Sequence, residues 1–344
     1  MLYKEYIKIE LISIHSVGNK VNEDGVILSL APLELNEECK DLLKKYFMTP
    51  FCGDEYYSFT HVTDLALNEV FLYVSGIFDD ANSFHENTMR LSEFLYEKSG
   101  HPNIKSGEIY VVLFRDCILD DVTVDAVGIF KSENKDTYIN VDRVDKSFVV
   151  GSSEGININK LDKGCLIFNT KREEGYVVAV VDNSNKSEAK YWVEDFLNVK
   201  PRQDKYFQTR NFMSVCKNFV SKQLPEEFEV SKADQVELLN RSVQYFKEND
   251  EFSIQEFSQS VLEQPELIES FNAYKDRYQS ERDVVFEDSF EISSDAVKKQ
   301  SRSFKSVIKL DKNFHIYVHG DRRMIEQGED EKGRYYKVYF KEEF

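Results

Sequence analysis

Apolar and polar residues alternate along much of the first half of the chain, a pattern that is typical of half-buried β-strands. In Tyr6–His15 the apolar positions 7, 9 and 11 alternate with charged ones. Further strands are expected in pairs, because short turn segments separate them. The predicted hairpins are Glu108–Leu119 with Val122–Lys131 around Asp120-Asp121, and Gly164–Thr170 with Gly175–Asp182; a shorter strand is predicted at 138–142.

Apolar residues at helical spacing predict helices elsewhere, and polar residues at their starts predict the caps. Asn36 is expected to cap a helix over 36–47, and Ser83 with Glu86 has the spacing of a capping box. From residue 187 onward helical spacing dominates. Thr209 is the expected cap of the helix that carries Phe212, and Ser231 opens the next one.

These elements predict an α+β protein with a mostly antiparallel, sheet-rich N-terminal domain, a helical middle region and a C-terminal β-hairpin. The expected boundaries are 1–186 for the first domain, 187–296 for the helical domain and 297–344 for a basic helix with the hairpin. That hairpin is expected to pair 314–319 with 335–340. Because isolated two-stranded ribbons are marginally stable, we expect it to pack on the first domain.

Composition points to an ordinary globular protein of a reducing compartment. The 344 residues are 41% hydrophobic, and the five cysteines are scattered without a CxxC pair, so no disulfide framework is expected. No apolar run approaches the roughly 18 residues of a membrane span. The first residues read as a strand and not as a signal peptide. A cytoplasmic protein without a membrane contact is the expectation.

The net charge of −18 is distributed unevenly. The segment 191–225 carries +3 and 297–325 carries +6, and they flank the segment 226–296, which carries −13. The overall charge disfavours non-specific binding to nucleic acid, because like charges repel over a long range. Two local basic islands still allow contact with phosphate.

The sequence motifs of the common enzyme chemistries are absent, so no cofactor, no metal and no catalytic activity are expected. His315 and His319 lie on a predicted strand, where residues four apart are separated by about 13 Å, too far to share a metal. The acidic pairs at 79–80 and 120–121 are expected to be turn residues. Asp182 with Glu188 and Lys190 is weakly similar to a nuclease metal site, but the spacing is short.

One stretch carries a family resemblance. The sequence YWVEDFL at 191–197, with Tyr191, Trp192, Asp195, Phe196 and Leu197, resembles an element of the bacterial nucleoid-associated protein family (NdpA-like). YINVDRVDKSF at 138–148, the strand at 164–168 and the closing strands are also similar to that family. The resemblance implies a non-enzymatic protein of the cytoplasm and nucleoid, with links to type II topoisomerases in some members.

The first hypothesis is therefore a protein that binds the DNA backbone with weak sequence selectivity through basic islands 191–225 and 297–325. The sequence leaves open whether the chain forms homo-oligomers. The candidate phosphate-binding residues are Lys200, Arg202, Lys205, Arg210, Lys217, Lys298, Lys299, Arg302, Lys305, Lys309, Arg322 and Arg323.

The alternative hypothesis is a protein-interaction module. The acidic segment 226–296 would meet a basic surface on a DNA enzyme such as a type II topoisomerase, and its charge would steer the association. For any single charged residue in either hypothesis, an exposed solubilising role is the simpler explanation. The clustering of like charges makes the two surfaces worth testing.

Overall fold

The computed structural model describes residues 2–183, 191–282, 284–304, 307–310, 314–317, 324–340 and 342. The chain divides into two compact units, Met1–Arg202 and Gln203–Phe344. The α+β class is confirmed, with a sheet-rich first part, helices in the middle and β-hairpins at the end. Among the described helices, none combines the length and the apolar character that crossing a membrane requires.

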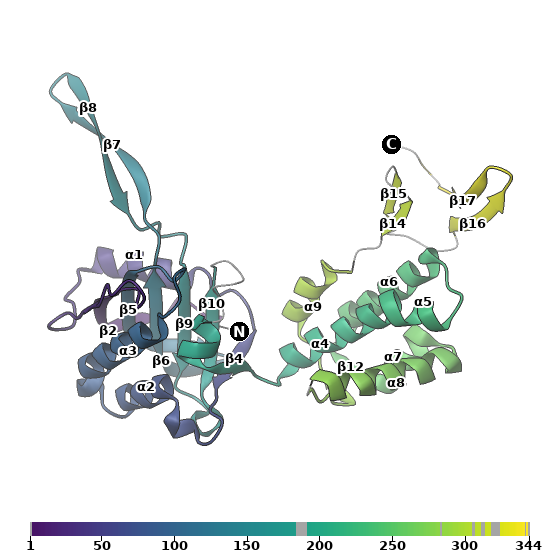
Figure 1. Ribbon diagram of the computed structural model, residues 1–344, viewed down its shortest axis with the longest axis horizontal. Coiled ribbons are helices and arrows are strands. Elements are labelled where there is room, and N and C mark those ends of the chain that lie inside the picture. Colours follow the sequence, from purple (N-terminus) through teal and green to yellow (C-terminus); the bar gives the residue numbers. More distant parts are fainter. Residues whose placement is uncertain are drawn as a thin grey trace. The chain divides into compact units, whose positions relative to one another are not determined.

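Unit 1 is built on an antiparallel sheet with the strand order β11-β4-β10-β9-β6-β5-β2-β3, and β1 also pairs with β5 (Figure 1). The strands are β1 (Leu2–Tyr3), β2 (Lys8–Val17), β3 (Val26–Ile27), β4 (Tyr56–Phe59), β5 (Gly107–Leu119), β6 (Val122–Ser132), β9 (Lys163–Phe168), β10 (Val177–Asp182) and β11 (Val199–Pro201). The helical segments are α1 (Glu37–Met48), η1 (Leu65–Leu67), α2 (Glu69–Asp79), η2 (Ala81–Ser83), α3 (Phe84–Lys98), η3 (Arg172–Glu174) and the π-helix η4 (Tyr191–Leu197).

Helices cover both faces of this sheet, so its central strands are buried on both sides. Along β5, Val111 and Leu113 belong to the core under α2, α3 and η4, whereas Val112 and Phe114 belong to the core under α1. The ring of Phe47 on α1 stacks on that of Phe130 with centroids 4.2 Å apart. Successive side chains point to opposite faces, so continuous apolar runs are what a doubly covered sheet requires.

The predicted hairpins of unit 1 are confirmed. Leu119 of β5 pairs with Val122 of β6, which leaves Asp120 and Asp121 as the two-residue turn. Both have positive φ angles, 47° and 64°, as a type I′ turn demands, and aspartate tolerates this backbone region better than most residues. Strands β9 and β10 pair as expected, with η3 between them.

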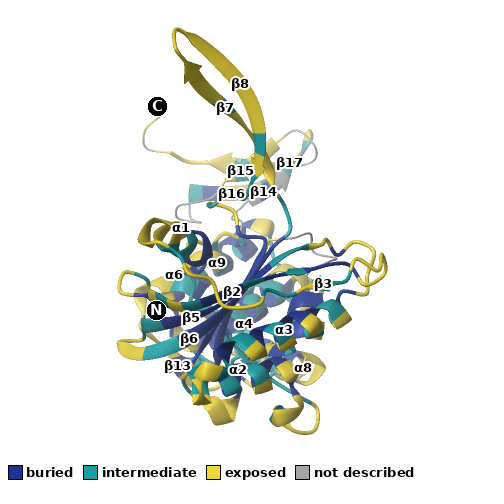
Figure 2. Cartoon of the chain, turned by 90° about the vertical axis from the view of Figure 1, so that its left-hand side faces the viewer, coloured by how far each residue is buried: buried dark blue, intermediate teal, exposed yellow. Residues whose placement is uncertain are grey.

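The strand predicted at 138–142 is confirmed as part of β7 (Asp136–Val144), and its partner β8 (Ser147–Gly155) was missed. The two strands form a separate ribbon that pairs with no other described strand. It extends away from the sheet, and its residues are almost all exposed (Figure 2).

The predicted cap at Asn36 is confirmed, because its side chain accepts a hydrogen bond from the backbone N–H of Cys39. The capping box predicted at Ser83 is wrong. Its hydroxyl donates to the carbonyl oxygens of Gly76 and Asp80 and caps no N–H of α3. The same hydroxyl accepts from Nδ2 of Asn87 at 2.9 Å, so its bonds go to partners other than the first N–H groups of α3, which spacing alone does not reveal.

Unit 2 begins with a helical array around an aromatic core. The ring of Phe212 lies against those of Phe246, Phe252 and Phe271, with centroids 4.2–6.2 Å apart. The array comprises α4 (Lys205–Asn218), η5 (Phe219–Gln223), α5 (Leu224–Glu227), α6 (Lys232–Glu248), β12 (Glu251–Ser253), α7 (Ile254–Phe257), η6 (Ser258–Leu262), α8 (Pro265–Arg282), β13 (Ser289–Glu291) and α9 (Ser294–Ser301).

Helix starts in unit 2 were also predicted from sequence. The helix start at Ser231 is confirmed, and the structure shows a capping box there, with Asp234 as its second member. The predicted cap at Thr209 is wrong, because α4 begins earlier and is capped by Asp204, which accepts from the N–H of Phe207. Thr209 is instead buried inside the helix.

A C-terminal β-hairpin is confirmed, but the predicted pairing of 314–319 with 335–340 is wrong. The structure contains two hairpins here, because each strand pairs with its neighbour in sequence. Ile308 and Ile325 from these hairpins pack with Ala233 and Val236 of α6. The three-part division of the chain, with this segment on the first domain, stays a prediction. The four strands are β14 (Val307–Leu310), β15 (Phe314–Tyr317), β16 (Ile325–Asp330) and β17 (Gly333–Val338).

A buried histidine joins α3 to the sheet and makes the stability of unit 1 depend on pH. Nδ1 of His15 on β2 accepts from the backbone N–H of Ser29 at 3.0 Å, so Nε2 carries the proton and donates to Oγ1 of Thr88 at 2.9 Å. Burial, and secondarily the nearby ring of His85, lower the pKa of His15 from 6.5 to about 4.

We predict that unit 1 loses stability as the pH falls from 6.5 towards 4. In that window the unfolded chain binds a proton at His15 that the folded chain does not bind. Denaturant titrations followed by the fluorescence of Trp192, the one tryptophan, report on unit 1. His15→Gln should flatten this pH dependence, whereas the exposed control His101→Gln should keep it; equal slopes in all three proteins would contradict the assignment.

Candidate nucleic-acid interface

The basic candidates of unit 2 lie on two helices whose apolar faces are buried. On α9, Ala296 and Val297 face the core, which leaves Lys298 and Lys299 on the exposed side, followed by Arg302. On α4, Asp204 caps the first turn and Lys205 is exposed directly after it. The helix-capping and burial patterns therefore direct these cations outward.

The helices α4 and α9 pack against each other and bring together residues that are about ninety positions apart in sequence. The backbone N–H of Ser293, the cap of α9, donates to Oγ1 of the buried Thr209 on α4 at 3.0 Å. Six residues further along α9, Nζ of Lys299 lies 5.1 Å from the ring centroid of Tyr206. We call the exposed cations at this junction, Lys205, Lys298, Lys299 and Arg302, the α4–α9 basic surface.

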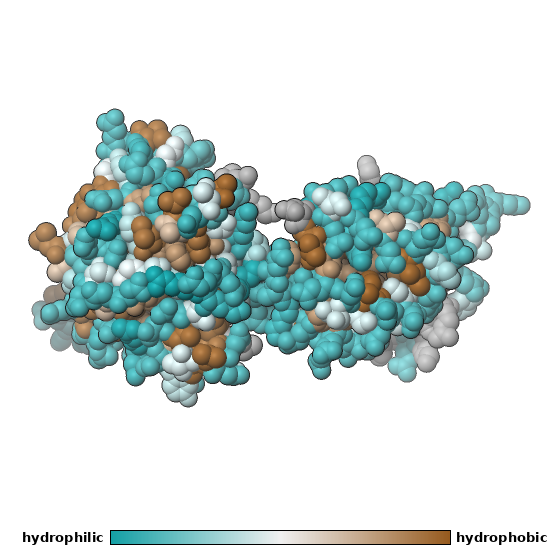
Figure 3. All heavy atoms as spheres, turned by 90° about the horizontal axis from the view of Figure 1, so that it is seen from below, coloured by the Kyte–Doolittle hydropathy of each residue, from teal (hydrophilic) through white to brown (hydrophobic). Residues whose placement is uncertain are grey.

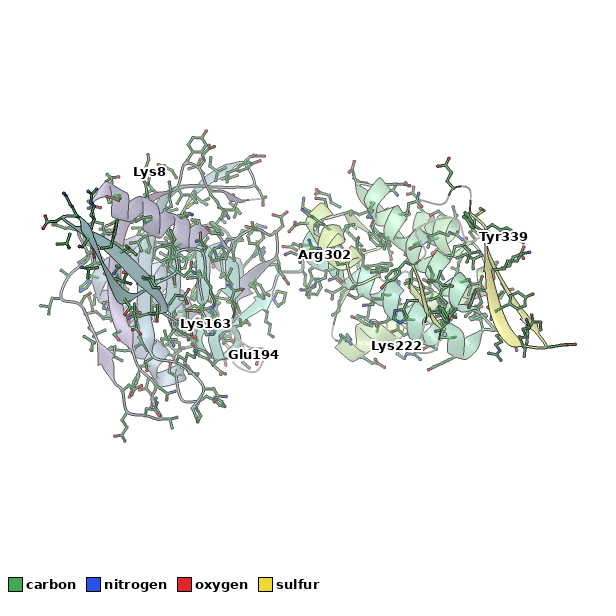
Figure 4. The ribbon with its side chains drawn as sticks, turned by 90° about the horizontal axis from the view of Figure 1, so that it is seen from above. Lys8, Lys163, Glu194, Lys222, Arg302 and Tyr339 are labelled. Atoms are coloured by element: carbon green, nitrogen blue, oxygen red, sulfur yellow. The ribbon has the colours of Figure 1, made fainter. Side chains whose placement is uncertain are left out.

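Two of these cations have acidic neighbours. Lys205 pairs with Glu291 at 2.6 Å, and Lys299 lies 3.8 Å from Asp295. The side chains are substantially exposed, and ion pairs of this kind contribute only about 0–1 kcal/mol, so a phosphate can compete for the cation. Within the described residues, no carboxylate lies within 4 Å of Lys298 or Arg302. Arg302 lies at the periphery of unit 2 (Figure 4).

The other candidates of the first basic island are placed differently. Lys200 and Arg202 belong to unit 1, whereas Lys205, Arg210 and Lys217 belong to unit 2, so the island is divided between the units. Arg210 and Lys217 are half-buried on α4, and the guanidinium of Arg210 lies 5.9 Å from the ring of Phe207. Both are less available to a large anion than the α4–α9 basic surface.

Arg202 has a structural use within unit 1. Its guanidinium donates to Oγ of Ser58 at 2.6 Å, to the carbonyl of Tyr176 at 3.3 Å and to the carboxylate of Glu174 at 2.6 Å. The hydrogen bond from Arg202 is the main reason that the pKa of Glu174 is lowered. Arg202 thus fastens the end of unit 1 to the edge of the sheet, and we leave it out of the surface.

Several candidates of the second island cannot be placed. Lys305, Arg322 and Arg323 lie outside the described residues, and so does the side chain of Lys309, whose backbone belongs to β14.

Sequence reasoning missed a cluster of buried charges at one end of the sheet in unit 1. Lys131 on β6 and Lys163 on β9 are opposite each other in register, and both are fully buried. Nζ of Lys131 lies 2.9 Å from Glu133, and Nζ of Lys163 lies 3.2 Å from Asp182. The hydroxyl of Tyr191 donates to Glu133 at 2.9 Å. Burial lowers the pKa of Lys131.

This cluster connects the motif 191–197 to the sheet. Tyr191 is bound by the cluster, while Trp192 and Phe196 pack in the core with ring centroids 5.0 Å apart. At the end of η4, the side chain of Asn68 donates to the carbonyl of Leu197. The aromatic residues of the motif thus hold η4 on the sheet. The signal in the sequence was one lysine near the end of the apolar strand β6 and another at the start of the apolar strand β9. The periodicity of a single strand does not show that two such lysines lie side by side.

The nuclease-like combination has little support here. Asp182 is engaged by Lys163, and Glu188 and Lys190 lie outside the described residues. Among the residues that the structure describes, no group of three or more His, Cys, Asp or Glu side chains could hold a metal ion.

Comparison with known families identifies the chain's relatives. The family model described as nucleoid-associated protein YejK matches residues 13–332 of the 344. The chain therefore belongs to this family of bacterial nucleoid-associated proteins, which places it at the nucleoid in the cytoplasm. A search of curated proteins found no match.

The buried cluster should be sensitive to the loss of one hydroxyl. Tyr191→Phe leaves a charged acceptor, Glu133, with one donor fewer in a buried site, so we expect a loss of about 1–3 kcal/mol in the free energy of unfolding of unit 1. Denaturant titration followed by Trp192 fluorescence measures it. Tyr6→Phe, at a largely exposed tyrosine, is the control and should change nothing. An unchanged stability for Tyr191→Phe would show that the cluster does not hold η4.

Proposed function

We propose that this member of the nucleoid-associated family binds the phosphate backbone of DNA directly, through the α4–α9 basic surface, and performs no catalysis. The observation that supports the proposal is the docking of α9 on α4, which places cations from both basic islands at one junction. A cluster of exposed cations can neutralise several phosphates, whereas scattered ones cannot act together.

The charge of the rest of the chain sets the character of this binding. Hydrophilic residues dominate the visible surface of each unit (Figure 3), and the net charge is −18. Long-range repulsion of DNA lowers the rate of encounter, so the affinity should be modest and should depend on short-range contact with phosphates. Phosphate contacts carry no sequence information, so we expect weak sequence selectivity.

We predict that anisotropy measurements with a labelled duplex, across a salt series, give a negative slope of log affinity on log salt. Each phosphate that the protein neutralises contributes about 0.9 to the magnitude of the slope. The triple variant Lys298→Gln, Lys299→Gln, Arg302→Gln should weaken binding and reduce that magnitude by roughly 2–3.

The matched control is Lys232→Gln, Lys247→Gln, Arg282→Gln, which removes the same residue types from exposed positions of the helical array. Both variants lower the net charge by three, so a difference between them reports position and not overall charge. Equal effects of the two variants, or a salt slope that the first variant leaves unchanged, would contradict the proposed surface.

A second candidate function is an acidic docking surface for a DNA enzyme such as a type II topoisomerase. The supporting observation is a groove of about 520 Å³ between α6 and the segment α7–η6, with Glu248 and Glu256 in its lining. Exposed carboxylates that converge on a groove can meet a basic surface of a partner and steer its approach.

For this candidate we predict that Glu248→Lys with Glu256→Lys reduces the amount of type II topoisomerase recovered in a pull-down with purified proteins. The same variant should leave direct binding to DNA unchanged or stronger, because it removes negative charge. Glu5→Lys with Glu38→Lys, at exposed positions of unit 1, is the control. Equal recovery with the variant and the control would exclude this groove as the docking site.

A further inference from the structure

The ribbon β7–β8 presents apolar side chains to solvent on a scale unlike the rest of unit 1. Ile139, Val141, Phe148 and Val150 are 61–70% exposed. The ribbon pairs with no other described strand and stands away from the sheet (Figures 1 and 2). A contiguous exposed apolar patch on an otherwise polar protein marks an interaction site, and a two-stranded ribbon alone is marginally stable.

The register shows that these side chains share one face. Val141 is opposite Val150, and Arg143 is opposite Phe148. Since side chains alternate between the faces, one face carries, from the base of the ribbon to its tip, the pairs Thr137/Glu154, Ile139/Ser152, Val141/Val150 and Arg143/Phe148. We call this the ribbon's apolar face.

The opposite face is more polar, and one of its polar pairs is satisfied within the ribbon. Nδ2 of Asn140 donates to Oγ of Ser153 at 2.7 Å. The ring of Tyr138 lies over Gly155, where an added Cβ would come within 3.0 Å of it. The apolar face is therefore the one that gains from being covered.

The charges of the ribbon disfavour nucleic acid and anionic membranes as its partner. Between Asp136 and Gly155 the sequence has four acidic and two basic residues. A surface with net negative charge repels phosphate groups of either kind. A protein surface with apolar residues between opposite charges is the better complement.

We propose that the apolar face binds the same face of a second copy of this chain, in antiparallel orientation about a twofold axis. The face is self-complementary in this arrangement. The cross-strand pair Ile139/Ser152 of each copy lies against the pair Val141/Val150 of the other copy. The pair Arg143/Phe148 at the tip lies against the pair Thr137/Glu154 at the base. An isologous contact requires this kind of self-complementarity.

Arg143 and Glu154 cannot meet within one chain. Glu154 pairs with Thr137, which is six residues from Arg143 along β7, a separation of about 20 Å. Nε of Arg143 also donates to the carbonyl of Asp145 at 3.0 Å, which holds the guanidinium at the tip. Any coupling between the two charges must therefore come from a contact between copies.

The contact is small. The face presents eight residues, against the roughly 20–30 on each side of a standard protein interface. We therefore expect a dimer that dissociates in the micromolar range, which sedimentation velocity across a concentration series can measure.

The test is a charge exchange in the full-length chain. Arg143→Glu alone and Glu154→Arg alone should each raise the dissociation constant of the dimer about tenfold or more, because like charges then lie diagonally across from each other at both ends of the contact. The double variant should restore it to nearly the original value. Removing apolar contact with Val141→Ser and Val150→Ser should also weaken the dimer.

Val144→Ser with Val149→Ser is the matched control, because these valines have similar exposure on the opposite face and should leave association unchanged. Trp192 fluorescence confirms that each variant retains the fold of unit 1. A wild-type chain that stays monomeric at all concentrations, or a charge exchange that fails to restore association, would overturn the proposal. Association that is lost in the opposite-face control would overturn it as well.

Discussion

The docking of α9 on α4 is the contact on which the functional interpretation of this chain depends. A buried threonine on α4 accepts a hydrogen bond from the backbone N–H of the residue that caps α9, and a lysine six residues further along α9 lies over a tyrosine ring of α4. Without this contact the two basic islands would be separate stretches in an acidic protein. With it, exposed cations from both islands lie on one pair of packed helices, and we propose that the DNA backbone contacts them together.

In unit 1 the main constraint is different. The sheet is covered on both faces, so charged groups at one end of it are buried. Lys131 and Lys163 are tolerated there because carboxylates and the hydroxyl of Tyr191 surround them. Removing one partner of such a group costs more than the pair contributes, so the residues must be retained together. The packing of the aromatic residues therefore explains the motif at 191–197, and no catalytic role is needed to account for them.

Local signals in the sequence predicted what local interactions determine. The two-residue turn at Asp120-Asp121, the cap at Asn36 and the helix start at Ser231 each depend on residues within a few positions of one another. The family resemblance was also visible in the sequence and is confirmed. The basic residues were recognised as two islands, but α4–α9 docking joins residues far apart in the chain, and periodicity does not report on such contacts.

The errors have the same physical origin. Ser83 has the spacing of a capping box, yet nearby carbonyl oxygens compete for its hydroxyl. The closing strands have suitable alternation for several pairings, and the structure uses those between sequence neighbours. Arg202 stays a candidate phosphate ligand by charge alone, and only the structure shows that its guanidinium already has partners within unit 1. The buried lysines were missed because only the neighbouring strands supply the groups that neutralise them.

The most direct test of the central claim is site-specific photo-crosslinking to a DNA duplex. A photo-reactive phenylalanine analogue in place of Ser294, exposed on α9 one turn before Lys298, should crosslink to DNA at low salt. The same analogue in place of Gln259, exposed in the acidic segment, should not. Crosslinks at position 259 with none at 294, or equal yields at both positions, would contradict a DNA-binding surface at the junction of α4 and α9.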